Sequence, residues 1–387
     1  MCCSLTAAAK QRFKRGLLSV GLILFGLQTN VALAANLQLD KLRLPPGFHI
    51  AVLTDAVPNA RQMALGRYAD GRGVLYVGSM GAGNVYAVEL DQGRAKAVHI
   101  IASGLPMPVG VAYRDGRLYV SAVSRILRLD GIDDRLSDPP APVVVTDRFP
   151  GATHHGWKFI AFGPDGWLYV PVGAPCNICD PDARFANIQR MKPDGSAVEM
   201  VARGVRNSVG FDWNPTDHSL WFTDNGRDMM GDDLPVTNSI ALPSPVSISA
   251  IRTVIRGIRQ TRNSGASESA MSSCRRWPSL GHTLRPLACA STRANNSRMR
   301  TGTTCSLPNT VRGTAARKLA TGLSGWCSIV RGVSFSLSPS LMAGCKRDAS
   351  GKESVWGRPV DVLVMPDGSL LISDDLAGAI YRVWYAP

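Results

Sequence analysis

The stretch GPDGWLYVPV, residues 163–172, decides the fold, because an Asp-Gly turn leads directly into alternating aromatic and aliphatic residues. Asp-Gly favours a tight turn, since glycine adopts positive φ without strain and the aspartate side chain hydrogen-bonds to the nearby backbone. The residues that follow have the composition and the alternation of a β-strand. The sequence therefore predicts a turn followed by a strand at this position.

The same unit recurs along the chain at a nearly constant spacing. Further copies are DGRGVLYVGS (70–79), DGRLYVSA (115–122), DGSLLISD (367–374) and, without the glycine, HSLWFTD (218–224). The equivalent leucines are Leu75, Leu118, Leu168, Leu220 and Leu370. A period of roughly 40–50 residues with several short strands is typical of a β-propeller, and the mature length leaves room for about six blades. A pair of β-sandwiches would not explain the constant spacing.

Residues 1–34 have the pattern of a secretory signal peptide. A basic stretch from Lys10 to Arg15 precedes the apolar run 16–27, and Ala32-Leu33-Ala34 supplies the small residues of a cleavage site. We therefore expect the mature protein in an oxidising periplasm. No apolar run reaches the ~18–20 residues that a membrane-spanning helix requires, so we expect no stable membrane insertion.

The positive charge of the chain is concentrated in one segment. The chain has 43 Lys and Arg against 29 Asp and Glu, a net charge of +14, which by itself suggests a nucleic-acid partner or an anionic membrane. However, residues 239–347 hold 16 basic residues and one acidic residue, Glu268. Without this segment and the leader, 23 basic residues face 28 acidic ones. We therefore expect no nucleic-acid partner.

Three clusters carry residues suited to chemistry. The first, Thr153 to Trp157, holds His155, which can act as a general base because an imidazole titrates near neutral pH. The second, GVRNSVGFDWNP (204–215), places Arg206 beside Asn207 between glycines, and an arginine fork suits carboxylate or quinone oxygens. The third, TDNGRDMMGDD (223–233), is rich in oxygen ligands of the kind that Ca²⁺ prefers.

Each cluster also has a plain structural interpretation. The histidine can be a hydrogen-bonded structural residue, the arginine can face solvent in a turn, and the acidic loop can be a solvated surface loop. The CxxC of Cys176 and Cys179 has neither a second CxxC for zinc nor a following histidine for haem. We expect a local disulfide there, as is usual in an oxidising compartment.

Four strings together resemble the pyrroloquinoline quinone (PQQ)-dependent sugar dehydrogenases, and most closely their L-sorbosone dehydrogenase branch. They are THHGWKFIAFGPDGWLYVPVGAPCNICD (153–180), GVRNSVGFDWNP (204–215), DNGRDMMGDDLP (224–235) and VWGRPVDVLVMPDGSLLISDDLAGAIYRV (355–383). The resemblance covers roughly residues 40–238 and 352–385. It implies a six-bladed all-β propeller that oxidises a sugar or a sugar aldehyde by hydride transfer to PQQ, with Ca²⁺ as Lewis acid.

The resemblance also implies roles for single residues. His155 takes the place of the catalytic base that removes the proton of the sugar C1 hydroxyl. Arg206 and Asn207 take the places of PQQ-contacting residues, with Arg206 near the reactive quinone carbonyl and therefore also catalytic. Arg358 would contact a PQQ carboxylate. The partners would be a small sugar substrate and a periplasmic electron acceptor, whereas the oligomeric state is not implied.

For calcium, the resemblance implies backbone carbonyls of Gly226 and Arg227, with a carboxylate from Asp233 nearby. Two other functions stay open. A calcium-dependent propeller hydrolase of the lactonase type would need a ring of Glu, Asp and Asn side chains around the channel. A non-catalytic periplasmic binding module would leave His155 without a chemical role.

Residues 239–350 depart from the rest of the chain, since they contain no turn-and-strand unit and hold five of the nine cysteines. They can be a basic disordered insertion or an out-of-frame translation. Residues 248–257, 287–294 and 307–315, written in permitted codons and regrouped one base earlier, give HFGYPYCHQG, GMRFYTG and AEHGSWNR. All three resemble, in order, the stretch that the family carries between its calcium loop and its last blade.

The domain organisation that we expect follows from these segments. A signal peptide (1–34) precedes the N-terminal blades (36–238), an out-of-frame segment that is disordered or poorly folded (239–350), and a closing blade (351–387). About two blades would be missing from the segment 239–350. The propeller would then be incomplete, its exposed strand edges would favour aggregation, and the chain as written would be inactive.

Sequencing the gene again tests the frame hypothesis. We expect two compensating one-base shifts, near codons 239 and 350, or a decayed gene whose alternative frame still encodes the family-like stretch. A confirmed frame with no such sequence in the alternative frame would contradict the hypothesis.

Overall fold

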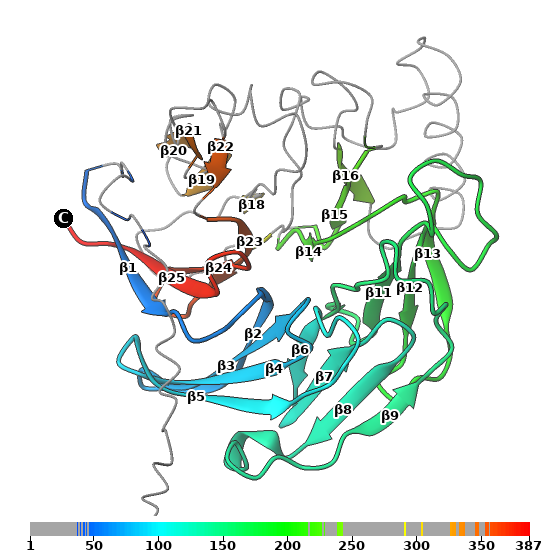
Figure 1. Ribbon diagram of the computed structural model, residues 1–387, viewed down its shortest axis with the longest axis horizontal. Coiled ribbons are helices and arrows are strands. Elements are labelled where there is room, and N and C mark those ends of the chain that lie inside the picture. Colours follow the sequence, from blue (N-terminus) through cyan, green and yellow to red (C-terminus); the bar gives the residue numbers. More distant parts are fainter. Residues whose placement is uncertain are drawn as a thin grey trace, which may run out of the picture. The chain divides into compact units, whose positions relative to one another are not determined.

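The computed structural model describes residues 46–226 except 216, residue 228, residues 238–242 and residues 357–387 (Figure 1). It also describes a few single positions between 37 and 44 and six short strands between 290 and 355. The predicted signal peptide lies outside these residues. All the described strands belong to one compact unit, which begins at Ala35.

The described strands form antiparallel sheets in which consecutive strands are neighbours. The first sheet is β2 (Ala60–Ala69), β3 (Arg72–Ser79), β4 (Val85–Asp91) and β5 (Arg94–Ala102). The second is β6 (Val111–Arg114), β7 (Arg117–Ser121), β8 (Ile126–Asp130) and β9 (Val143–Thr146), with a 3-10 turn η2 (Ile132–Asp134) after β8. The third is β10 (Ala161–Phe162), β11 (Leu168–Val172), β12 (Asn187–Met191) and β13 (Glu199–Arg203).

A fourth sheet has three strands and a closing sheet has four. The fourth is β14 (Phe211–Trp213), β15 (Leu220–Asp224) and β16 (Asn238–Leu242), and the closing sheet is β23 (Pro359–Val364), β24 (Leu370–Asp374), β25 (Ala379–Tyr385) and β1 (Phe48–Thr54). The remaining described strands form three two-stranded pairs: β17 (Ala290–Ser291) with β18 (Thr303–Thr304), β19 (Trp326–Ile329) with β20 (Val333–Ser336), and β21 (Cys345–Arg347) with β22 (Glu353–Val355).

The predicted repeat is confirmed, because each copy forms the first hairpin of a sheet. The five equivalent leucines all lie in the second strand of their sheet, in β3, β7, β11, β15 and β24. In the Asp115-Gly116 turn both residues have positive φ, 51° and 74°, as a two-residue hairpin turn requires. The copy without glycine turns through a longer loop between Trp213 and Leu220, in which His218 has a φ of 55°.

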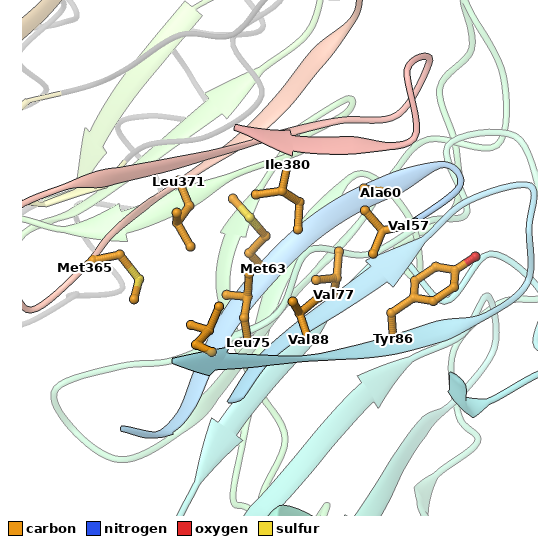
Figure 2. Packing of buried hydrophobic residues seen from close by; sticks show 11 residues of the cluster. Val57, Ala60, Met63, Leu75, Val77, Tyr86, Val88, Met365, Leu371 and Ile380 are labelled. Carbon is orange, nitrogen blue, oxygen red and sulfur yellow. The ribbon is translucent and has the colours of Figure 1, made fainter. Parts of the chain in front are cut away.

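The second strands β3, β7 and β11 are largely buried on both faces, because the sheets stack face to face. Leu75 and Val77 of β3 pack toward the closing sheet, in the cluster of Figure 2, where Leu371 and Ile380 lie opposite them. Their neighbour Tyr76 packs toward the second sheet. Similar clusters join the second sheet to the third and the third to the fourth. This succession of stacked antiparallel sheets, four-stranded except for the three-stranded fourth sheet, is a β-propeller.

The first and last segments of the described chain pair with each other. β1 runs antiparallel to β25, from Phe48 opposite Tyr385 to Thr54 opposite Ile380, and the two strands lie side by side in Figure 1. β23 in turn contacts β2 of the first sheet. The closing sheet therefore contains strands from both termini of the propeller.

A buried carboxyl joins the closing sheet to the first sheet. Asp361 of β23 accepts a hydrogen bond of 2.8 Å from the Met63 N–H of β2, and burial raises the pKa of Asp361 to about 7. Ser373 of β24 adds a second link, since its hydroxyl donates to the Arg61 carbonyl at 2.7 Å.

The fourth sheet extends past the residue at which the composition changes. β16 ends at Leu242, whose side chain is fully buried in the cluster between the third and fourth sheets. Most of residues 243–356 lie outside the described residues, so the blade count of about six and the incomplete propeller stay predictions.

Candidate functional site

The predicted site residues that the structure describes gather at one edge of the stacked sheets. In an antiparallel sheet the loop before the first strand and the loop after the second strand lie at the same edge. His155 precedes β10, Arg206 and Asn207 precede β14, and Arg358 precedes β23. Gly226 follows β15. The Asp-Gly turns of the repeat lie at the opposite edge.

An apolar contact brings three of these loops together. Val209, from the loop of Arg206, and Val360, from the start of β23, are buried against each other, and Trp157 packs on them. The ring of Trp157 lies edge-on to the His155 ring, with centroids 5.7 Å apart. The structure therefore brings the loop of His155, the loop of Arg206 and the start of β23 together around one small apolar cluster.

His155 is held in one orientation. The residue is only 4% exposed and has a φ of 51°, a left-handed conformation that is uncommon for residues other than glycine. Its Nδ1 lies 2.9 Å from the Ala174 carbonyl oxygen. Because a carbonyl only accepts, Nδ1 carries the proton and Nε2 is the basic nitrogen of the neutral ring.

A glycine makes room for this histidine. A Cβ on Gly173 would lie 2.5 Å from the Cβ of His155, a separation that real side chains do not tolerate. The close approach of the 153–157 loop to the end of β11 therefore depends on Gly173.

Arg206 is buried, and each nitrogen of its guanidinium donates at least one hydrogen bond. It is 5% exposed. Its Nε and Nη2 donate to the backbone and side-chain oxygens of Asn177, at 3.0 and 2.7 Å. Its Nη1 donates to the Asn225 carbonyl at 3.0 Å, and Nη2 also lies 3.3 Å from a carboxylate oxygen of Asp228. The solvent-facing alternative for this arginine is therefore wrong.

The backbones of the His155 and Arg206 loops are linked through Ala174. The Ala174 carbonyl accepts a hydrogen bond from the His155 ring, and the Ala174 N–H donates to the Arg206 carbonyl at 2.8 Å. A shift of either loop would therefore be transmitted to the other.

Buried polar atoms without partners lie next to Arg206. Among the described residues, Asn207 Nδ2, Ser208 Oγ and Asn225 Oδ1 are buried and have no hydrogen-bond partner. Leaving such an atom unpaired costs about 1–3 kcal/mol. Meanwhile their backbones are fixed, since Asn207 N–H donates to Asp224 at 2.9 Å and Asn225 N–H to the Asn207 carbonyl at 3.0 Å. A donor (Asn207 Nδ2), a hydroxyl that can donate or accept (Ser208 Oγ) and an acceptor (Asn225 Oδ1) thus fit a ligand that carries both carbonyl and hydroxyl or amine groups.

Arg358 makes its contacts within the closing sheet. Its N–H donates to the Asp374 carboxylate at 2.9 Å, and its Nε pairs with Asp375. Asp375 is buried and also pairs with Arg61 at 2.7 Å. The Arg358 side chain is 31% exposed, so it lies at the same edge as the other site residues but is more accessible to solvent.

Two of the three predicted calcium ligands, Arg227 and Asp233, lie outside the described residues, and Gly226 is half-buried. The described part of the chain contains no group of three or more His, Cys, Asp or Glu side chains that could hold a metal. The predicted disulfide between Cys176 and Cys179 is confirmed.

Two functional features were not predicted from the sequence. Asn177, inside the CxxC, contacts Arg206, although the spacing of the cysteines alone gives no sign of this. Lys158 is 1% exposed, and its Nζ donates to the carbonyls of Gly156 at 2.8 Å and Val123 at 2.5 Å. A lysine between Trp157 and Phe159 in an apolar run was the available signal.

Lys158 makes stability depend on pH. Burial lowers its pKa to about 7, whereas in the unfolded chain a lysine titrates near ~10.4. Between these values the unfolded chain binds more protons, so the free energy of unfolding rises with pH by up to ~1.4 kcal/mol per unit. In Lys158→Met we expect the free energy of unfolding, measured by urea denaturation, to rise less between pH 7.5 and 9.5 than in the unsubstituted protein. The same dependence of this free energy on pH in both proteins would contradict the assignment. Lys96→Met, at an exposed lysine, is the control.

No helix among the described residues is long and apolar enough to cross a membrane.

Comparison with known proteins gives a curated relative and many solved structures of similar fold. No protein-family model matches the chain. An uncharacterized protein of Borreliella burgdorferi is 25% identical over 389 residues, covering 93% of this chain and 95% of the relative.

Three solved structures illustrate the likeness. A Trichoderma reesei protein of carbohydrate-active enzyme family AA12 is 14% identical, with a TM-score of 0.59, covering 89% of this chain and 98% of its own. The holo PQQ domain of pyranose dehydrogenase from Coprinopsis cinerea is 14% identical (TM-score 0.58; 88% and 96% covered). The PQQ-bound aldose sugar dehydrogenase of Streptomyces coelicolor is 17% identical (TM-score 0.51; 88% and 99% covered). The chain therefore shares the fold of these proteins.

Proposed function

We propose that the chain derives from a PQQ- and calcium-dependent oxidoreductase that oxidises a sugar or a sugar aldehyde of the aldose or sorbosone type. The observation that carries the proposal is the link His155–Ala174–Arg206, which ties a buried imidazole with a basic nitrogen to the backbone of a buried arginine. Two of the fold relatives are described as a PQQ domain and as a PQQ-bound sugar dehydrogenase, which supports the choice of cofactor.

The unpartnered polar atoms beside Arg206 agree with this cofactor. A tricyclic quinone with carboxylates offers acceptors for Asn207 Nδ2 and for the Arg206 guanidinium, and Arg358 would hold a carboxylate at the accessible rim. Gly226, Arg227 and Asp233 would supply oxygen ligands for Ca²⁺. When bound, PQQ supplies a quinone that accepts hydride, and Ca²⁺ supplies Lewis acidity toward its oxygens.

The protein residues provide proton transfer and orientation. His155 Nε2 accepts the proton of the sugar C1 hydroxyl, and the Nδ1–H bond to Ala174 stabilises the imidazolium that results. Arg206 stabilises negative charge that develops on an oxygen next to it. The low exposure of both residues strengthens these interactions, because little water competes with them.

The remaining parts of the proposal concern the surroundings of the enzyme. We propose a periplasmic location through the signal peptide and a periplasmic electron acceptor. We also retain the frame hypothesis for residues 239–350, under which the chain as written would be inactive and the frame-restored protein active.

Reduction of an artificial electron-accepting dye tests the function. Frame-restored protein with PQQ and Ca²⁺ should reduce the dye in the presence of an aldose or sorbosone, whereas the chain as written should not. In His155→Gln we expect kcat to fall about 10²–10⁴-fold, the range for loss of a general base, with PQQ affinity and thermal stability retained.

Several outcomes would contradict the proposal. Bound PQQ without dye reduction by any tested sugar would exclude the dehydrogenase. Calcium-dependent lactone hydrolysis in the same preparation would favour the hydrolase, and sugar binding without either reaction would favour a binding module.

A further inference from the structure

We propose that Asn177, held in place by the Cys176–Cys179 disulfide, is a positioning residue that sets the orientation of the Arg206 guanidinium and ties it to the loop after β15. The inference rests on the proposed function for its catalytic consequence. The positioning of Arg206 itself rests only on the contacts that residues 176–179 make in the structure.

Asn177 binds the Arg206 guanidinium through two acceptors. Its backbone oxygen accepts a hydrogen bond from Nε at 3.0 Å, and its side-chain Oδ1 accepts one from Nη2 at 2.7 Å. Nε and Nη2 form one edge of the planar guanidinium, so two acceptors on that edge fix the plane as well as the position. A single acceptor would fix the position of one nitrogen only.

The side-chain amide of Asn177 is itself fixed by a second loop. Its Oδ1 also accepts the Asp228 N–H at 2.8 Å, and its Nδ2 donates to the Asp228 carbonyl at 3.1 Å. These two bonds determine which way the amide faces, because a flipped amide would direct NH₂ toward both the Asp228 N–H and the guanidinium. Asn177 therefore couples Arg206 to the segment in which calcium ligands are predicted.

The disulfide supplies the rigidity that this segment otherwise lacks. Asn177 follows β11 in a loop whose neighbouring side chain, Ile178, is 61% exposed and so adds little packing. The bond between Cys176 and Cys179 closes the chain around Asn177 over a separation of three residues. Closing a short loop removes most of its alternative conformations, which keeps both Asn177 oxygens in place for Arg206.

Hydrogen exchange distinguishes a disulfide that only stabilises the fold from one that positions Asn177. If the disulfide only stabilises the fold, its removal would raise hydrogen exchange throughout the molecule. If it positions Asn177, its removal would raise exchange at the amides that depend on Arg206 and on the loop after β15. Ala174 and Asn225 are such amides, since Ala174 N–H donates to the Arg206 carbonyl, Arg206 Nη1 binds the Asn225 carbonyl, and neither N–H donates to Asn177.

Hydrogen–deuterium exchange of the full chain, read for peptides that contain Ala174, Asn225 and Asp228, tests the proposal. In Asn177→Ala and in the double variant Cys176→Ser/Cys179→Ser we expect exchange to rise about tenfold or more at these amides, with peptides of β3 unchanged. Asn177→Asp keeps both oxygens toward Arg206 and should restore protection at Ala174. Asn84→Ala, in the equivalent loop of the first sheet, is the matched control.

The outcomes separate this inference from the proposed function. Unchanged exchange at Ala174 and Asn225 in both variants, or a uniform rise in all peptides, would overturn the positioning role. In frame-restored protein, Asn177→Ala should weaken PQQ binding by roughly 10-fold, as loss of a residue that supports a ligating group commonly does. Local exchange that rises as expected in a protein that never binds PQQ would leave the positioning role intact and contradict the cofactor.

Discussion

The pairing of β1 with β25 is the constraint on which the rest of the structure depends. It places strands from the first and last parts of the propeller in one sheet, and that sheet packs on the first sheet through the cluster that contains Met63 and Leu371. Because of this closure, the segment that carries Arg358 lies at the same edge as the loops of His155 and Arg206. Val360 can then reach Val209 and Trp157, so the apolar centre of the site is assembled from segments about 200 residues apart in the chain.

The buried polar side chains that the structure describes at this edge fall into two groups, those whose polar atoms have hydrogen-bond partners and those with an atom that has none. Some, such as Asp361 and Lys158, satisfy backbone groups and join loops or sheets, and burial moves the pKa of each to about 7. Others, such as Asn207 and Ser208, are buried with an atom that has no partner among the described residues. Residues of the first kind rigidify the site, and those of the second kind identify the place where a ligand would make the missing bonds.

Local chemistry made the fold predictable from sequence, and long-range contacts made the site only partly predictable. The Asp-Gly turns and the LYV strands depend on residues adjacent in the chain, so the repeat and the propeller could be inferred. His155 and Arg206 were candidates from their own chemistry, their roles toward sugar and PQQ were implied by the resemblance, and the disulfide was predicted from the spacing of its cysteines. The role of Asn177 could not be foreseen, because its partners Arg206 and Asp228 lie 29 and 51 residues away. Lys158 was missed because a lysine in an apolar run gives no sign of which carbonyls it binds.

The central claim is that the edge formed by the His155, Arg206 and Arg358 loops binds PQQ. Titration of frame-restored protein with PQQ and Ca²⁺, followed through the fluorescence of its tryptophans, tests it most directly, since Trp157 lies within the site. The account predicts saturable one-to-one binding that is about tenfold weaker in Asn207→Leu, as loss of ~1.4 kcal/mol of hydrogen bonding would produce. The absence of saturable binding, or equal affinity in the variant, would contradict it.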